Sequence, residues 1–123
     1  MMHVGKSSET TRSYSRDDLA GFAALTGGAT GDTVGDSVPE PLIGALFSYL
    51  LGVHLPGFGT NYLKQEMRFL APAPLDRPLT ARVEITRLRP EKHLVDLATT
   101  CRTADGTLIC EGRALVLARD VGA

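Results

Sequence analysis

Apolar residues crowd one stretch near the middle of the chain, and shorter alternating runs follow it toward the C-terminus. The central stretch, Val38–Phe58, opens with Glu40-Pro41, and proline is favoured at the first helical position. It ends in His54-Leu55-Pro56-Gly57, where proline and glycine stop a helix. Apolar residues occupy almost every side of the predicted helix between these signals, which is the pattern of a buried helix. The helix is too short to span a bilayer, which needs ~20 residues.

The two faces of this predicted helix differ in side-chain size. Bulky side chains form a broad face, which consists of Leu42, Ile43, Leu46, Phe47, Leu50 and Leu51. Small residues form a narrow face, because Gly44, Ser48 and Gly52 recur every fourth position with Ala45 beside them. This small face suits helix-on-sheet packing, close helix contact across a dimer, or the wall of an acyl tunnel, and the sequence leaves these alternatives open.

Four strand-like runs follow the helix. The run from Leu79 to Leu88 alternates cleanly, with Ala81, Val83 and Ile85 on one face and polar residues on the other, as in a half-buried strand. The run from Asn61 to Leu70 alternates poorly. The remaining two runs extend from His93 to Thr103 and from Leu108 to Ala118, and Arg89–Lys92 is a predicted turn. We therefore expect four antiparallel strands in sequence after the helix.

The N-terminal part adds a short strand and a short helix. Residues 1–10 are polar and are predicted to be a flexible tail. Thr11 to Tyr14 is a candidate strand, and Ser15 with Asp18 three positions later resembles a capping box that opens a helix. Residues 11–120 then form a single α+β domain, in which one antiparallel sheet wraps around one long central helix. This is the hot-dog architecture, and it buries the apolar faces of both elements.

A hairpin is predicted near the C-terminus. Asp105-Gly106 is a strong two-residue turn signal, and a turn centred there places Cys101 opposite Cys110. A disulfide between them is geometrically possible, although a cytosolic chain keeps its thiols reduced. The alternative is a pair of small core residues.

Composition narrows the function classes. The chain has 123 residues, 43% hydrophobic and 22% charged, with a net charge of −1, so nothing points to nucleic acid or to an anionic membrane surface. The N-terminal residues are polar and show no signal peptide, so we expect a cytoplasmic protein. His3, His54 and His93 are far apart and form no metal motif. No cofactor is expected, and no G-x-S-x-G elbow supports a serine hydrolase.

Several segments carry a family resemblance. They are FAALTG (Phe22–Gly27), the long stretch Ala45–Ile85, the Arg89–Lys92 turn and TADGTLICEGRALVLA (Thr103–Ala118). Within them, LPGFGTNYL and FLAPAP match the patterns L-P-G-x-G-x-x-Y-L and F-x-x-P-V. The chain resembles the MaoC-like hot-dog domains of (R)-specific enoyl-CoA hydratases and dehydratases. The resemblance implies a homodimer or a paired heterodimer that binds acyl-CoA or an acyl-carrier-protein thioester at the subunit interface, and it implies substrate contacts at Gly44, Ser48, Gly57 and Gly59.

The segment that matches the catalytic motif departs from the family. The family pattern S-G-D-x-N-P-x-H follows the first helix, and its aspartate and histidine activate water. Gly28 stands at the aspartate position, Thr30 stands at the asparagine position, and a shortened loop removes the region of the histidine. At the entrance to the central helix, Pro39-Glu40 replaces the family's His-Gly, whose glycine N–H stabilises the thioester oxyanion. Ser48, which matches a pocket serine, is retained.

Three functional hypotheses follow. Asp32, Asp36 or Glu40, with Ser48, could replace the missing catalytic groups if burial raised a carboxyl pKa, although these acids could equally be solvated. Glu40 at the helix start could instead serve a thioester hydrolase. In the third, the protein is a non-catalytic hot-dog subunit or an acyl-chain binder that pairs with a catalytic partner. The resemblance favours a hydratase, and the missing aspartate and histidine predict that its activity is weak or altered.

Overall fold

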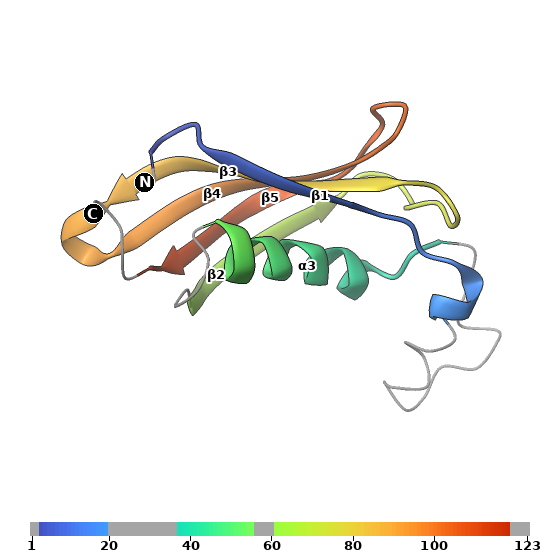
Figure 1. Ribbon diagram of the computed structural model, residues 1–123, viewed down its shortest axis with the longest axis horizontal. Helices are drawn as coiled ribbons and strands as arrows, with labels where there is room; N and C mark the ends of the chain where they lie inside the picture. The colour runs from blue at the N-terminus through green and yellow to red at the C-terminus, as the bar shows by residue number, and fades with distance from the viewer. Residues whose placement is uncertain (1–2, 20–36, 56–60, 119–123) are drawn as a thin grey trace.

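The computed structural model describes residues 3–19, 37–55 and 61–118 of the chain. A long helix, α3 (Glu40–Tyr49), lies across one face of a five-stranded sheet (Figure 1). The helix continues into a π-helical turn, Leu50–His54, and a 3-10 turn, Pro90–Lys92, joins two of the strands. The strands are β1 (Ser7–Arg12), β2 (Asn61–Phe69), β3 (Leu79–Arg89), β4 (Leu94–Thr103) and β5 (Leu108–Leu117). This arrangement confirms the predicted hot-dog fold.

The strand order is β1-β3-β4-β5-β2, and every neighbouring pair is antiparallel. Four antiparallel strands follow the helix along the chain, as predicted, and their predicted bounds agree with the structure to within a residue or two. β2 lies beside β5 at the edge of the sheet and does not pair with β3. The connection 70–78 contains Pro72, Pro74 and Pro78, and residues before proline favour extended backbone over a tight turn. The chain therefore crosses to the far side of the sheet before β3 begins.

Alternating side chains of the sheet form the core together with one face of the helix. Ile43, Phe47 and Leu50 of the helical segment are fully buried. They belong to one core cluster with buried sheet residues that include Leu79, Ala81, Val83, Ile85, Val95, Leu97 and Val116. The opposite face of the helix, with Ser48 and Tyr49, is exposed. The prediction that the helix is buried on all sides is therefore wrong for a single chain. One sheet layer covers only one side of a helix.

The N-terminal strand starts earlier than the sequence predicts. Residues 7–10, which the sequence places in a polar tail, belong to β1 and pair with β3. Strand pairing at a sheet edge is made by backbone groups, so it needs no apolar alternation. The predicted capping box is confirmed: the Ser15 N–H donates to the Asp18 carboxylate at 2.8 Å, and the Asp18 N–H donates to Ser15 Oγ at 3.2 Å.

The C-terminal hairpin has the predicted register and a different turn. Gly106 N–H donates to the Thr103 carbonyl at 3.0 Å, and Gly106 has a positive φ of 91°, which glycine adopts without strain. The pairing of β4 with β5 shifts register between Cys101 and Arg102. Cys101 therefore still pairs with Cys110, as the sequence predicts. Both cysteines are buried and free, so in this structure they are core residues without a disulfide.

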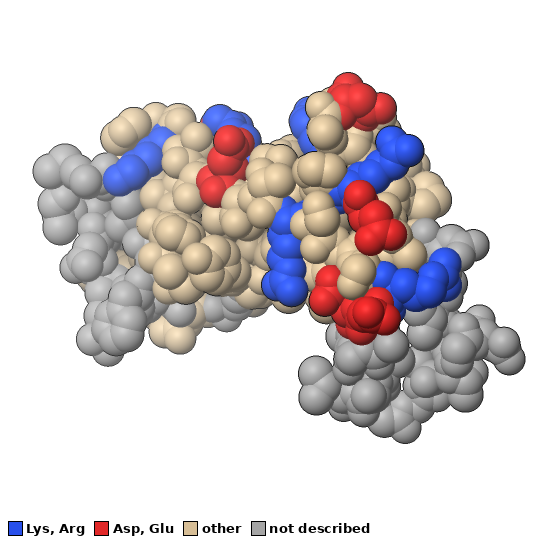
Figure 2. Space-filling model, turned by 45° about the vertical axis from the view of Figure 1, so that its right-hand side comes forward, with Lys and Arg blue, Asp and Glu red and all other residues tan. Residues whose placement is uncertain are grey.

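In the described part of the chain, no helix is long and apolar enough to cross a membrane. On the face shown in Figure 2, acidic and basic side chains lie interspersed, without a large area of one sign.

Candidate functional site

Glu40 begins the central helix and faces solvent. It lines a hollow of about 380 Å³ together with Ser37, Val38 and the segment 69–73. Two backbone hydrogen bonds shape this hollow: Val38 N–H donates to the Ala73 carbonyl at 2.8 Å, and Leu42 N–H donates to the Pro39 carbonyl at 3.0 Å. Among the described residues no side chain caps the N-terminus of α3, and Glu40 supplies a negative charge that favours this helix end.

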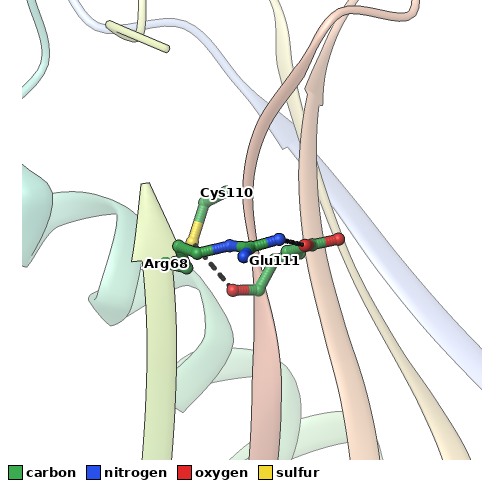
Figure 3. Close-up of polar contacts among 3 residues, drawn as sticks. All are labelled: Arg68, Cys110 and Glu111. Atoms are coloured by element: carbon green, nitrogen blue, oxygen red, sulfur yellow. Dashed lines mark hydrogen bonds and ion pairs between the residues drawn. The ribbon is translucent and has the colours of Figure 1, made fainter. Parts of the chain in front are cut away.

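Cys110 lies near this helix end but is not a candidate nucleophile. Burial, followed by the negative charge of Glu40, raises the pKa of Cys110 from its ordinary value of 9.0 to about 11, although the Arg68 N–H acts in the opposite direction. The Cys110 thiol is directed at the Glu111 carbonyl, 4.0 Å away, while the Glu111 carboxylate pairs with Arg68 of β2 (Figure 3). A neutral, buried thiol is unreactive.

The small face of α3 lies partly against β2 and is partly open. A Cβ placed on Gly44 would lie 3.4 Å from the Met67 Cε, so this part of the helix packs closely on the edge strand. Ser48 lies one turn later and is exposed, and a Cβ on Gly52 would meet nothing within 4 Å among the described residues. Helix-on-sheet packing therefore accounts for Gly44 but not for Ser48 or Gly52.

The two candidate catalytic residues that the structure describes, Glu40 and Ser48, do not lie at one point. Glu40 and Ser48 are eight positions apart on one helix, about 12 Å along its axis, so they cannot both contact one reacting carbonyl. Asp32, Asp36, Gly57 and Gly59 lie outside the described residues. Among the residues that the structure describes, no three His, Cys, Asp or Glu side chains gather closely enough to hold a metal ion.

Sequence reasoning missed a pair of polar side chains at the end of the helix. His54 Nε2 and Tyr49 Oη are 3.1 Å apart, and their rings meet edge to face. The π-helical turn brings them together, and Leu55 N–H closes it by donating to the Leu50 carbonyl at 2.8 Å. Residues five apart diverge on a regular α-helix, so the sequence did not predict this pair.

Buried polar groups without a partner were also invisible in the sequence. Two buried side-chain atoms have no hydrogen-bond partner in the described structure: Thr99 Oγ1 on β4 and Gln65 Nε2 on β2. Thr99 is fully buried in the core, where an unpaired hydroxyl is costly. Gln65 is only partly buried and belongs to the edge strand, so its free donor lies near a surface.

The side of the sheet opposite α3 is a charged surface on which most arginines have acidic partners. The ion pairs include Arg82–Glu84 at 2.8 Å, Arg89–Asp96 at 2.8 Å, Lys64–Glu66 at 3.3 Å and Arg68–Glu111. The exposed pairs among them are worth little individually, and only Arg89–Asp96 of these four is partly buried. They leave this surface with mixed charge, which does not single out any arginine for a CoA phosphate.

Comparison with known proteins identifies the family. An (R)-specific enoyl-CoA hydratase from Aeromonas caviae is 33% identical to this chain over 126 residues, which cover 94% of each protein. The chain belongs to the (R)-specific enoyl-CoA hydratase family. A 3-hydroxybutyryl-CoA dehydratase from Methylorubrum extorquens is 32% identical over 94% of this chain and 80% of its own length. No family model matches the chain.

Solved structures of hydratases share the fold. The (R)-hydratase from A. caviae involved in PHA biosynthesis superposes with a TM-score of 0.86 at 32% identity, covering 96% of this chain and 98% of that chain. An R-hydratase from Pseudomonas aeruginosa has a TM-score of 0.83 at 31% identity, covering 95% and 82%. Membership of the (R)-specific enoyl-CoA hydratase family therefore rests on sequence and on structure together.

Proposed function

We propose that this hydratase-family protein binds acyl thioesters, of CoA or of an acyl-carrier protein, beside the exposed face of α3, and that its hydratase activity is weak or absent. The observation that carries the proposal is the position of Glu40. Its carboxylate stands in the first turn of α3 and lines the hollow at that helix end. In the family pattern a glycine stands at this position, and its backbone N–H polarises the thioester carbonyl.

The physical reason is electrostatic. Hydration of an enoyl thioester builds negative charge on the thioester oxygen, and preorganised N–H donors stabilise that charge. A carboxylate beside those donors opposes the same charge. The hydration step also needs an acid–base group, and this sequence has Gly28 and Thr30 where the family has aspartate and asparagine. Binding survives these changes because the exposed face around Ser48 remains open.

Thioester hydrolysis is the second candidate, and the exposure of Glu40 favours it. An exposed carboxylate that borders a hollow can activate water as a general base. In such a reaction water adds to the thioester carbonyl, the carbon–sulfur bond breaks, and the thiol leaves with the proton that the carboxylate accepted. The Glu40→Gln variant keeps the size of the side chain and removes the base.

One assay separates these functions. Purified protein is incubated with crotonyl-CoA while the enoyl absorbance and the release of free thiol are followed in parallel, and binding of butyryl-CoA is measured by calorimetry. We expect butyryl-CoA binding with little change in either signal. Thiol release that Glu40→Gln abolishes would establish the hydrolase. Turnover by hydration as fast as that of the A. caviae enzyme, or no thioester binding at all, would refute the proposal.

A further inference from the structure

The central helix and the strand β2 run in opposite directions and match in register (Figure 1). The start of α3 lies beside the end of β2, because Glu40 and Phe69 line the same hollow. Four positions further along the helix, a Cβ on Gly44 would lie 3.4 Å from the Met67 Cε, two positions earlier in the strand. Four helical residues advance about 6 Å, and two strand residues advance about 6.8 Å. Each step of four along the helix therefore matches a step of two along the strand.

The next step of this register pairs a serine with a glutamine. Ser48 follows Gly44 by four positions. Gln65 precedes Met67 by two positions, so it lies beside Ser48 in the same register. Gln65 is also on the helix side of the sheet, because its partner across the strands is Ala114, which is buried in the core.

The helix and the strand separate at this point. At Gly44 the helix contacts β2, whereas a Cβ on Gly52 would meet nothing within 4 Å among the described residues. Leu63, which matches Gly52 in the register, is 54% exposed. Ser48 stands between the two glycines and is itself exposed. The opening between α3 and β2 therefore begins at Ser48 and Gln65.

Gln65 brings a hydrogen-bond donor to this opening. Its Nε2 atom is shielded from solvent and has no partner in the described structure. A buried donor without an acceptor is costly, and a ligand that supplies an acceptor removes that cost. The Ser48 hydroxyl is a second donor one residue pair away, and a carbonyl oxygen has two lone pairs that can accept from both groups.

We propose that Gln65 is a ligand-binding residue, and that its Nε2 and the Ser48 Oγ donate to one carbonyl oxygen of the bound acyl thioester. The inference rests on the proposed function and deepens it by naming a polar contact in the thioester site. Glu40 lies about 12 Å from Ser48 along the helix axis, so this contact is separate from the hollow at the helix start. An acyl thioester of CoA or of an acyl-carrier protein offers the thioester carbonyl and the amide carbonyls of its pantetheine arm.

Gln65→Met tests the contact, because methionine is of similar size and has no N–H donor. In calorimetry the variant should bind butyryl-CoA roughly tenfold more weakly than wild type. Its midpoint of urea unfolding should be unchanged or higher, since the lost donor has no partner in the free protein. A glutamine with only a structural role would give a lower midpoint and unchanged binding. Unchanged binding, or a lowered midpoint, would overturn the inference.

Two further variants control this result. Glu66 lies on the opposite face of β2, where it pairs with Lys64 at 3.3 Å, so Glu66→Gln should bind butyryl-CoA as wild type does. Ser48→Ala should weaken binding, and Ser48→Ala with Gln65→Met should lose less than the sum of the single losses, because both donors act on one oxygen. Equal weakening by Glu66→Gln, or strictly additive losses, would contradict the shared carbonyl.

A second ligand identifies the carbonyl. S-butyl-CoA is a thioether that lacks the thioester carbonyl and keeps the amide carbonyls of the pantetheine arm. Equal loss of both ligands in Gln65→Met would assign the contact to a pantetheine amide, and loss confined to butyryl-CoA would assign it to the thioester. Wild-type protein that binds neither ligand would refute the proposed function and this inference with it. Wild-type binding that Gln65→Met leaves unchanged would refute this inference alone.

Discussion

The carbonyl oxygen of Glu66 occupies the space that a side chain at position 112 would need. A Cβ placed on Gly112 would lie 1.9 Å from that oxygen and 3.0 Å from the Met67 Cα. At Gly112 the backbone of β5 therefore leaves no room for a side chain beside the edge strand, and glycine permits this close approach.

Gly112→Ala should destabilise the protein by about 1–3 kcal/mol, because the added methyl group must push β2 away from β5. Chemical denaturation measures the change in the free energy of unfolding. Gly52→Ala is the matched control, since a Cβ there meets nothing within 4 Å among the described residues. The control should be neutral or stabilise by up to about 1 kcal/mol. A Gly112→Ala protein as stable as wild type would show that the strand contact is looser than described.

Thr99→Val should stabilise the protein by about 1 kcal/mol, because it replaces a buried, unpartnered hydroxyl by a methyl group of similar size. The midpoint and slope of urea unfolding measure the effect. Thr80→Val is the comparison, because the Thr80 hydroxyl shares a hydrogen bond of 2.9 Å with Thr11. The comparison variant should gain nothing, and destabilisation by Thr99→Val would reveal a hidden partner for the hydroxyl.

Stability should fall in alkaline solution as the two buried thiols titrate. Burial raises the pKa of Cys101 and of Cys110 from 9.0 to about 11. A raised pKa favours the neutral thiol in the folded state, so the stabilisation is complete below pH 9.0 and is lost as the pH rises through about 11. Denaturation at a series of pH values measures this, and a Cys101→Ala, Cys110→Ala double variant should have a shallower pH dependence. An unchanged slope would contradict the assignment.

The capping box should weaken in acid. The Ser15 N–H and the Ser15 hydroxyl hold the pKa of Asp18 below its ordinary value of 3.8. A lowered pKa favours the ionised carboxylate in the folded state, so its contribution is present above pH 3.8 and is lost as the pH falls through the lower folded pKa. Asp18→Asn should therefore differ from wild type in stability at neutral pH and converge with it in acid. A difference that persists at the lowest pH would indicate a role other than charge.

The candidate site could be predicted only in part. The family resemblance drew attention to Glu40 and Ser48, and both lie on α3 as expected. The sequence did not indicate that Glu40 borders a hollow formed with the segment 69–73, because that contact joins residues far apart in the chain. Nor did it reveal the Tyr49–His54 pair, since only the π-helical turn brings positions five apart together.

Local chemistry by itself determined the elements of this protein. The alternation from Leu79 onward, the capping box at Ser15 and the cysteine pairing across the last hairpin follow from side-chain period and turn residues, which act over a few positions. Only the tertiary structure decided that β2 lies beside β5 and that one face of α3 stays exposed. Both outcomes depend on contacts between segments that are far apart in the chain. An apolar pattern predicts that a surface is buried, but it does not identify the segment that buries it.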